Sequence, residues 1–226
     1  MMISRTALPT ALLGFALLAL PAFPLSAAEW AVEGQVGYLG LTAENSAKAV
    51  FESRGGVTFG GGARFALDNG IFVAAGYRAF SKDGERVFVA SPSSRVARLG
   101  HPLSAKINPL LLSGGYRFRQ GHLIVPYAGL GVNLTSYKEE SNVAGEGYSE
   151  SRSKVGFHLL GGVEVGRGLV RFAGEAAWST VPDAVGFGGV TKVYGENNLG
   201  GMSFLGKIVL AFGGKTGTQP DTNDTP

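Results

Sequence analysis

Charged side chains recur in this sequence inside stretches that are otherwise apolar. The run GGMSFLGKIVLAFGG, residues 200–214, carries a single lysine, Lys207, among side chains suited to hydrocarbon. Seven further charged residues occupy comparable positions. The full set is Glu33, Arg64, Arg78, Arg117, Glu164, Arg171, Glu175 and Lys207. Buried charges are tolerated when they are paired, and this set contains both signs, so we predict that it forms an internal network of salt bridges.

Residue types that could support catalysis or bind a metal do not form a recognisable group. The chain has three histidines, His101, His122 and His158, and no cysteine, which excludes disulfides and thiolate metal sites. His158 and Glu164 are separated by about 20 Å along one predicted strand, too far for direct contact. The glycine-rich GGVTFGGGAR lacks the Lys-Ser/Thr pair of a phosphate-binding loop. We therefore predict no enzymatic activity, no cofactor and no metal site.

The elements that must position the charges are β-strands, because apolar residues recur with a period of two. In EWAVEGQVGYLG, the side chains of Trp30, Val32, Val36 and Tyr38 alternate with those of Ala31, Glu33, Gln35 and Gly37. The same alternation occurs in GVTFGGGARFAL, IFVAAGYRAF, LLLSGGYRF, IVPYAGLGVNLT, VGFHLLGGVEV, VRFAGEAAW and the run around Lys207. In every stretch the charged residues lie opposite the apolar face.

An apolar face on every strand suits lipid, where a sheet must close to satisfy its backbone groups. The sequence therefore predicts an all-β fold, an eight-stranded antiparallel up-and-down transmembrane β-barrel with the charges in its lumen. Its connections alternate between tight turns, LDNG, RQGH and GRG, and long segments near 41–55, 81–106, 137–153 and 180–198. This alternation is typical of bacterial outer-membrane barrels, with three short periplasmic turns and four long extracellular loops.

The first 28 residues have the features of an export signal. Arg5 precedes the apolar ALLGFALLALPAF, and SAAEW supplies small residues at a cleavage site, so we expect a signal peptide over 1–28. Pro21 and Pro24 leave too short an apolar run for a membrane-spanning helix. The net charge of +3 is scattered along the chain, which argues against a nucleic-acid partner.

The mature chain resembles the small eight-stranded outer-membrane barrels, the family of the OmpA transmembrane domain and its porin-like relatives. The resemblance covers most of residues 29–212 and is carried by PYAGLGVNL and by SFLGKIVLAF, which is similar to the final strand of such barrels. It implies an outer-membrane β-barrel domain over 29–213 in a Gram-negative cell envelope. The remainder, 214–226, is rich in Thr, Asp and Pro and is expected to be a disordered periplasmic tail.

The resemblance also implies partners. The barrel-assembly machinery recognises the final strand of these barrels. The resemblance therefore implies that the assembly signal here consists of Phe204, Ile208, Leu210 and Phe212. We expect the outer surface of a monomer to contact outer-membrane lipid and lipopolysaccharide, and the loops to contact an unknown extracellular partner.

Four functions fit these observations. The first is a structural and surface-interaction scaffold whose lumen is plugged by side chains, because a barrel of eight strands is only wide enough for its side chains to meet. The second is a narrow, porin-like channel for small solutes. A lipid-A-modifying outer-membrane enzyme and a soluble, lipocalin-like carrier are the third and fourth, and the carrier would require the apolar face to point inward.

Overall fold

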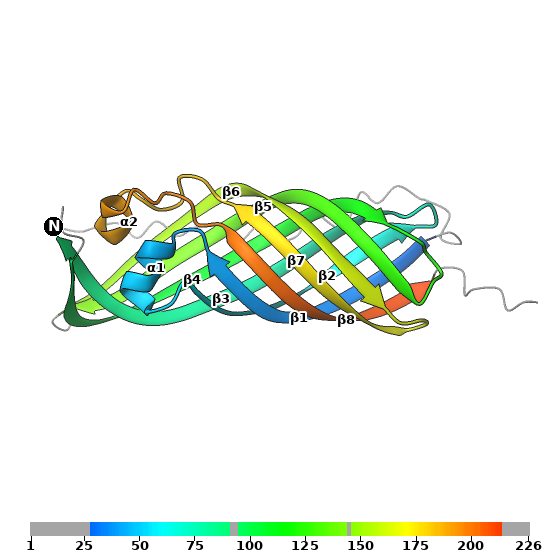
Figure 1. Ribbon diagram of the computed structural model, residues 1–226, viewed down its shortest axis with the longest axis horizontal. Coiled ribbons are helices and arrows are strands. Elements are labelled where there is room, and N and C mark those ends of the chain that lie inside the picture. The colour runs from blue at the N-terminus through cyan, green and yellow to red at the C-terminus, as the bar shows by residue number, and fades with distance from the viewer. Residues whose placement is uncertain (1–27, 91–94, 144–145, 214–226) are drawn as a thin grey trace, which may run out of the picture.

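The computed structural model describes residues 28–90, 95–143 and 146–213, and within them the chain forms one closed sheet. Eight antiparallel strands follow one another around the barrel, and the last pairs with the first (Figure 1). They are β1 (Ala28–Leu41), β2 (Gly55–Leu67), β3 (Ile71–Ala90), β4 (Arg95–Arg117), β5 (Ile124–Val143), β6 (Glu146–Val165), β7 (Val170–Thr180) and β8 (Gly201–Gly213). The predicted fold is confirmed, whereas residues 1–27 of the predicted signal peptide and the predicted tail, 214–226, lie outside the described residues.

The alternation of side chains places apolar residues on the outside of the barrel. On β8, Ile208 is 54% exposed whereas its neighbour Val209 is completely buried. Lys207, on the other side of Ile208, points inward. The same outward exposure of large apolar side chains is found on all eight strands. A surface of this kind is unfavourable in water and suits the hydrocarbon of a bilayer.

The tight turns lie at one end of the barrel, which we call the turn end, together with the start of β1 and the end of β8. In the turn between β2 and β3, the Gly70 amide donates to the Leu67 carbonyl at 2.9 Å, and the Ile71 amide donates to Asn69 Oδ1 at 3.1 Å. Gly70 has a φ of +96°, a conformation that favours glycine. The predicted Asn-Gly turn therefore closes this hairpin.

The opposite end, which we call the loop end, contains more regular structure than the sequence indicates. Most of the predicted loops at 81–106 and 137–153 belong to strands, since β3 and β4, and likewise β5 and β6, continue as long hairpins. Outward residues here include Asp83, Lys106 and Lys138, so the apolar alternation disappears although the backbone ladder continues. The hairpins therefore project beyond the apolar band (Figure 1).

The other two connections at the loop end contain short helices, α1 (Glu44–Phe51) and α2 (Gly189–Val193). In α1, Lys48 forms an ion pair with Glu44 one turn earlier. The hydrogen bond and charge of Lys48 lower the pKa of the Glu44 carboxyl. Figure 1 shows both helices at the same end of the barrel. Neither helix, nor any other in the described part of the chain, has the length and apolar character needed to span a membrane.

The interior of the barrel is filled by side chains at two levels. Near the turn end, Phe72 and Tyr127 pack edge to face within an apolar cluster that also contains Val209. Near the loop end, Phe80, Ile107 and residues from the connections form a second cluster. Small residues make room for the bulky ones: a Cβ on Gly162 would lie 2.5 Å from the Tyr127 ring. Phe80, an aromatic near a strand end that could have faced the membrane interface, fills the lumen instead.

Candidate functional site

Charged side chains interlock across the lumen on both sides of the apolar cluster near the turn end. Near the turn end, Glu164 accepts hydrogen bonds from three arginines: Arg64 at 2.6 Å, Arg117 at 2.7 Å and Arg171 at 2.8 Å. Glu29 contacts the same three arginines, accepting from Arg117 and from Arg171 at 2.7 Å each and lying 3.8 Å from Arg64. Glu164 is 1% exposed, so this part of the network is withdrawn from bulk solvent.

A second carboxylate, Glu175, organises the charges farther from the turn end. Arg78 donates to its Oε1 at 3.0 Å, while the Tyr127 hydroxyl, at 3.1 Å, and Lys207 Nζ both donate to its Oε2. Glu33 connects the two halves because it accepts from Arg64 at 2.9 Å and lies 3.2 Å from Lys207. The network is therefore continuous from Glu29 to Arg78.

All eight residues predicted for the network lie in the lumen, and the structure brings them together. Every strand contributes a member, since Tyr127 supplies the contribution of β5. Glu29 is the charged member that the sequence-based prediction did not include. It has the same parity as Glu33 on β1, so the period of two places it on the inner face.

The chemistry of this network is structural and electrostatic. Taking charges out of water is costly, and the cost is offset only when each charge has close partners of opposite sign. Arginine satisfies this requirement by donating in a fork to two carboxylates at once, as Arg117 does to Glu29 and Glu164. Removal of Glu164 would leave Arg64, Arg117 and Arg171 to share Glu29 and Glu33. Removal of Glu175 would take away the carboxylate that Arg78 contacts.

A small cavity of about 50 Å³ lies beside the network and is lined by residues that include Ser113, His158, Glu175 and Lys207. The Ser113 hydroxyl and His158 Nε2 are 2.8 Å apart, a pairing that sequence spacing alone does not predict. Liquid water occupies about 30 Å³ per molecule, so this cavity has room for a very small number of waters. It is too small for an organic substrate. In the described residues, no three His, Asp or Glu side chains gather as a metal site would require.

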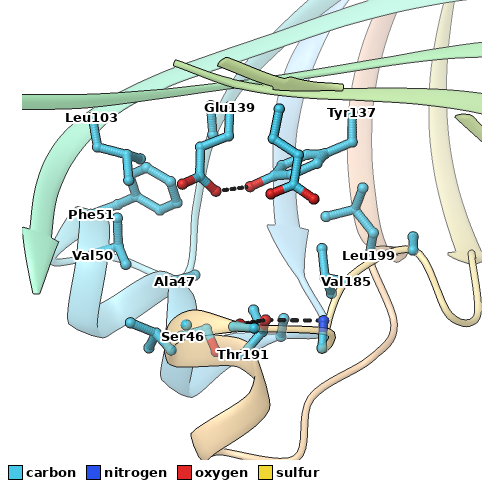
Figure 2. Close-up of a pocket in the computed structure, with 18 of the residues that line it drawn as sticks. Ser46, Ala47, Val50, Phe51, Leu103, Tyr137, Glu139, Val185, Thr191 and Leu199 are labelled. Carbon is cyan, nitrogen blue, oxygen red and sulfur yellow. Dashed lines mark hydrogen bonds between the residues drawn. The ribbon is translucent and has the colours of Figure 1, made fainter. Parts of the chain in front are cut away.

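A much larger cavity, about 530 Å³, opens at the loop end and is called here the loop-end cavity. Its walls come from α1, the upper barrel, the projecting hairpins and the connection containing α2, and most of them are apolar (Figure 2). Phe80 and Ile107 line it from below. On β3, Phe80 is the inward residue that follows Arg78, so the apolar layer separates this cavity from the charge network.

The few polar groups of the loop-end cavity are concentrated on β5 and β6. The Tyr137 hydroxyl donates to Glu139 at 2.7 Å, and Figure 2 shows both side chains directed into the cavity. Burial, followed by the charge of Glu139, raises the pKa of Tyr137, so its hydroxyl remains a donor. Glu139 lies directly opposite Glu150 in the ladder. Arg152 donates to Glu150 from Nε at 2.6 Å.

On the opposite wall, Ser46 of α1 is 5% exposed, and its hydroxyl has no hydrogen-bond partner among the described residues. A buried hydroxyl without a partner is uncommon. Sequence reasoning predicted no ligand site at this end. The α1 segment lay in a predicted loop, and no spacing in the sequence shows that it meets β5 and β6.

The four residues of the predicted assembly signal lie on the outer face of β8. Phe204, Ile208, Leu210 and Phe212 are all exposed on the barrel surface, with Phe212 close to the turn end. None of them contributes to the lumen. They form an apolar stripe on β8, the strand that pairs with β1 to close the barrel.

A closed antiparallel barrel with an apolar exterior and a charged interior defines an integral membrane β-barrel. Residues 15–166, more than half of the 226-residue chain, match the family described as outer membrane protein beta-barrel domain. The chain belongs to this family. No curated protein matches it in sequence.

Solved structures of small outer-membrane barrels resemble the fold at low sequence identity. A major outer membrane protein of Thermus thermophilus has 12% identity and a TM-score of 0.57, with 82% of this chain and 100% of that chain covered. Neisserial surface protein A has 13% identity and a TM-score of 0.51, with 82% and 99% covered. The attachment invasion locus protein Ail of Yersinia pestis, in complex with the heparin analogue sucrose octasulfate, has 14% identity and a TM-score of 0.49, with 83% and 99% covered. At these identities the similarity concerns the fold.

Proposed function

We propose that this protein is a non-enzymatic scaffold of the Gram-negative outer membrane, whose plugged barrel holds the loop end at the cell surface for contact with an extracellular partner. The observation that carries the proposal is the salt-bridge network in which every strand takes part. A lumen filled in this way is rigid and closed, while the structure built at the loop end is extensive. Function then resides at that end, as is common for loops supported by a rigid scaffold.

The family and the sequence together support this localisation. The N-terminal 28 residues would direct export, the apolar outer face would contact outer-membrane lipid and lipopolysaccharide, and the monomer would place its turn end in the periplasm. The stripe of Phe204, Ile208, Leu210 and Phe212 would be read by the barrel-assembly machinery during insertion. Enzymatic activity is not part of the proposal, because the Ser113–His158 pair borders a cavity of only about 50 Å³.

A narrow channel for small solutes is the alternative function. It would require a continuous water path past Glu164, Arg64 and Arg117, which are at most 4% exposed. The layer containing Phe80 would also have to open. Conductance of the reconstituted protein separates the two functions.

Surface display can be tested with single cysteines, since the natural chain has none. Lys192 in α2 and Arg167 in the last tight turn are both exposed. We expect a membrane-impermeant maleimide to label Lys192→Cys on intact cells, and to label Arg167→Cys only after the outer membrane is permeabilised. Labelling of Arg167→Cys alone on intact cells would contradict the proposed orientation.

A further inference from the structure

We propose that the loop-end cavity binds a small organic cation, a molecule with an aromatic or aliphatic body and one ammonium group. This goes beyond the scaffold role, which requires no small ligand. The cavity volume of about 530 Å³ lies within the usual range for small-molecule sites, roughly 300–1,000 Å³. Its walls are largely apolar, with few polar groups, which is also the usual composition of such sites.

The apolar body of the ligand would occupy the space between α1 and the barrel. Val50 and Phe51 border this space from the helix, and Leu103 and Ile107 border it from β4. Figure 2 shows Val50, Phe51 and Leu103 around the same opening. Binding would remove the apolar surfaces of the ligand and of the cavity wall from water. This burial stabilises the complex by roughly 25 cal/mol per Å² of apolar surface.

The charge of the ligand is indicated by Glu139. This carboxylate lines the cavity and forms no ion pair with the described residues, and its hydrogen-bond donor is the neutral Tyr137 hydroxyl. The residue opposite it in the ladder is Glu150, which carries the same charge, and like charges placed directly opposite are unfavourable. Arg152 compensates the charge of Glu150, so a ligand cation would be needed at Glu139.

Neither arginine of the cavity wall, Arg86 or Arg152, forms an ion pair with Glu139. Arg152 is engaged with Glu150 through Nε, and its guanidinium lies 4.3 Å from the centre of the Phe187 ring. Arg86 lies 5.5 Å from the centre of the Tyr148 ring. The ligand's ammonium group therefore has one uncompensated carboxylate to bind.

Ser46 supplies an independent indication that the cavity is built for a ligand. Its hydroxyl is buried in the wall formed by α1 and has no partner among the described residues. An unsatisfied buried hydroxyl is costly. A polar atom on the ligand would satisfy it, while the ammonium group binds Glu139 across the cavity.

The proposal can be tested by isothermal titration calorimetry of the full mature chain in nanodiscs of zwitterionic lipid at pH 7. The probes are 2-naphthylmethylamine, 2-naphthalenemethanol and 2-naphthoate, which share one aromatic body and differ in charge, with empty nanodiscs as the blank. We expect saturable binding of one amine per barrel, at least tenfold tighter than binding of the alcohol or the acid. Equal or tighter binding of 2-naphthoate would overturn the proposal, and so would the absence of saturable amine binding above the blank.

Variants locate the binding site. Glu139→Gln should weaken amine binding at least tenfold while leaving alcohol binding nearly unchanged. The matched control is Glu140→Gln on the next residue of β5, because Glu140 pairs with Lys106 and Lys138 outside the cavity. Ala105→Phe, which fills the cavity, should abolish binding of both probes.

Circular dichroism confirms that each variant is folded. If Glu139→Gln folds poorly, Glu150→Gln provides a second test, since it frees Arg152 to pair with Glu139 and should likewise weaken amine binding. Unchanged amine affinity in a folded Glu139→Gln or Glu150→Gln variant would overturn the assignment of the ammonium site.

Discussion

At the scale of single residues, Glu164 is the most heavily partnered carboxylate of the lumen. Three arginines donate to it, and it is 1% exposed. Its inward direction is predictable from the sequence, because Glu164 alternates with Val163 and Val165 on an apolar strand. The identity of its partners is not predictable, because strand stagger determines which residues share a level of the barrel.

Glu164→Gln should destabilise the barrel by about 3 to 5 kcal/mol, the usual cost of removing one partner from buried ion pairs, because three arginines would then share only Glu29 and Glu33. The measurement is urea-induced unfolding in lipid vesicles, followed by the fluorescence of Trp30 and Trp178 on the outer face. Glu140→Gln is the control and should have little effect, because its ion pairs are exposed. A loss of stability no larger than that of the control would show that the network contributes little.

Ile208 and Lys207 are neighbours on β8 with opposite surroundings. Ile208 faces lipid, so Ile208→Arg should cost roughly 2 to 4 kcal/mol if the residue lies near the bilayer midplane. Lys207→Arg keeps the charge in the lumen next to Glu33 and Glu175 and should be mild. The same unfolding measurement compares them, and equal losses would mean that the assigned faces of β8 are incorrect.

At the scale of elements, the sequence predicts strands well inside the apolar band and poorly beyond it. The alternation in VGFHLLGGVEV locates the membrane part of β6, whereas ESRSKV has no apolar face although its backbone pairs with β5. The helix α1 is likewise not predictable from the sequence, because an eight-residue helix within a loop has too few turns for a clear apolar period. The loop-end cavity depends on these elements, so it could not be predicted from the sequence.

The outer stripe of β8 gives a prediction about assembly. Phe212→Ala should lower the amount of folded protein in the outer membrane of living cells, because the assembly machinery would read the final strand less well. Phe172→Ala on β7 is the matched control, since Phe172 is also a lipid-facing aromatic, 61% exposed. Quantitative immunoblotting of outer-membrane fractions measures the amount of each variant in cells. When the purified variants refold into vesicles in vitro, their yields should differ much less. Equal levels of the two variants in cells would contradict the assembly signal.

At the scale of the whole molecule, the filled lumen separates the turn end of the barrel from the loop-end cavity. The network and the apolar layer with Phe80 and Ile107 fill the lumen, and the loop-end cavity lies beyond that layer. Closure is predictable in outline, because eight strands enclose little space and the lumen face carries long charged side chains. The connection of all eight strands through one network depends on Tyr127, whose hydrogen bond to Glu175 only the folded structure reveals.

Single-channel conductance in a planar lipid bilayer tests the closed lumen most directly. Wild-type protein should show no large or stable steps, because paired side chains occupy the path. Glu164→Gln combined with Glu175→Gln should raise the conductance and favour anions, since five cations would then face only Glu29 and Glu33. Large and stable steps from the wild-type protein would contradict the plugged barrel and would favour the channel.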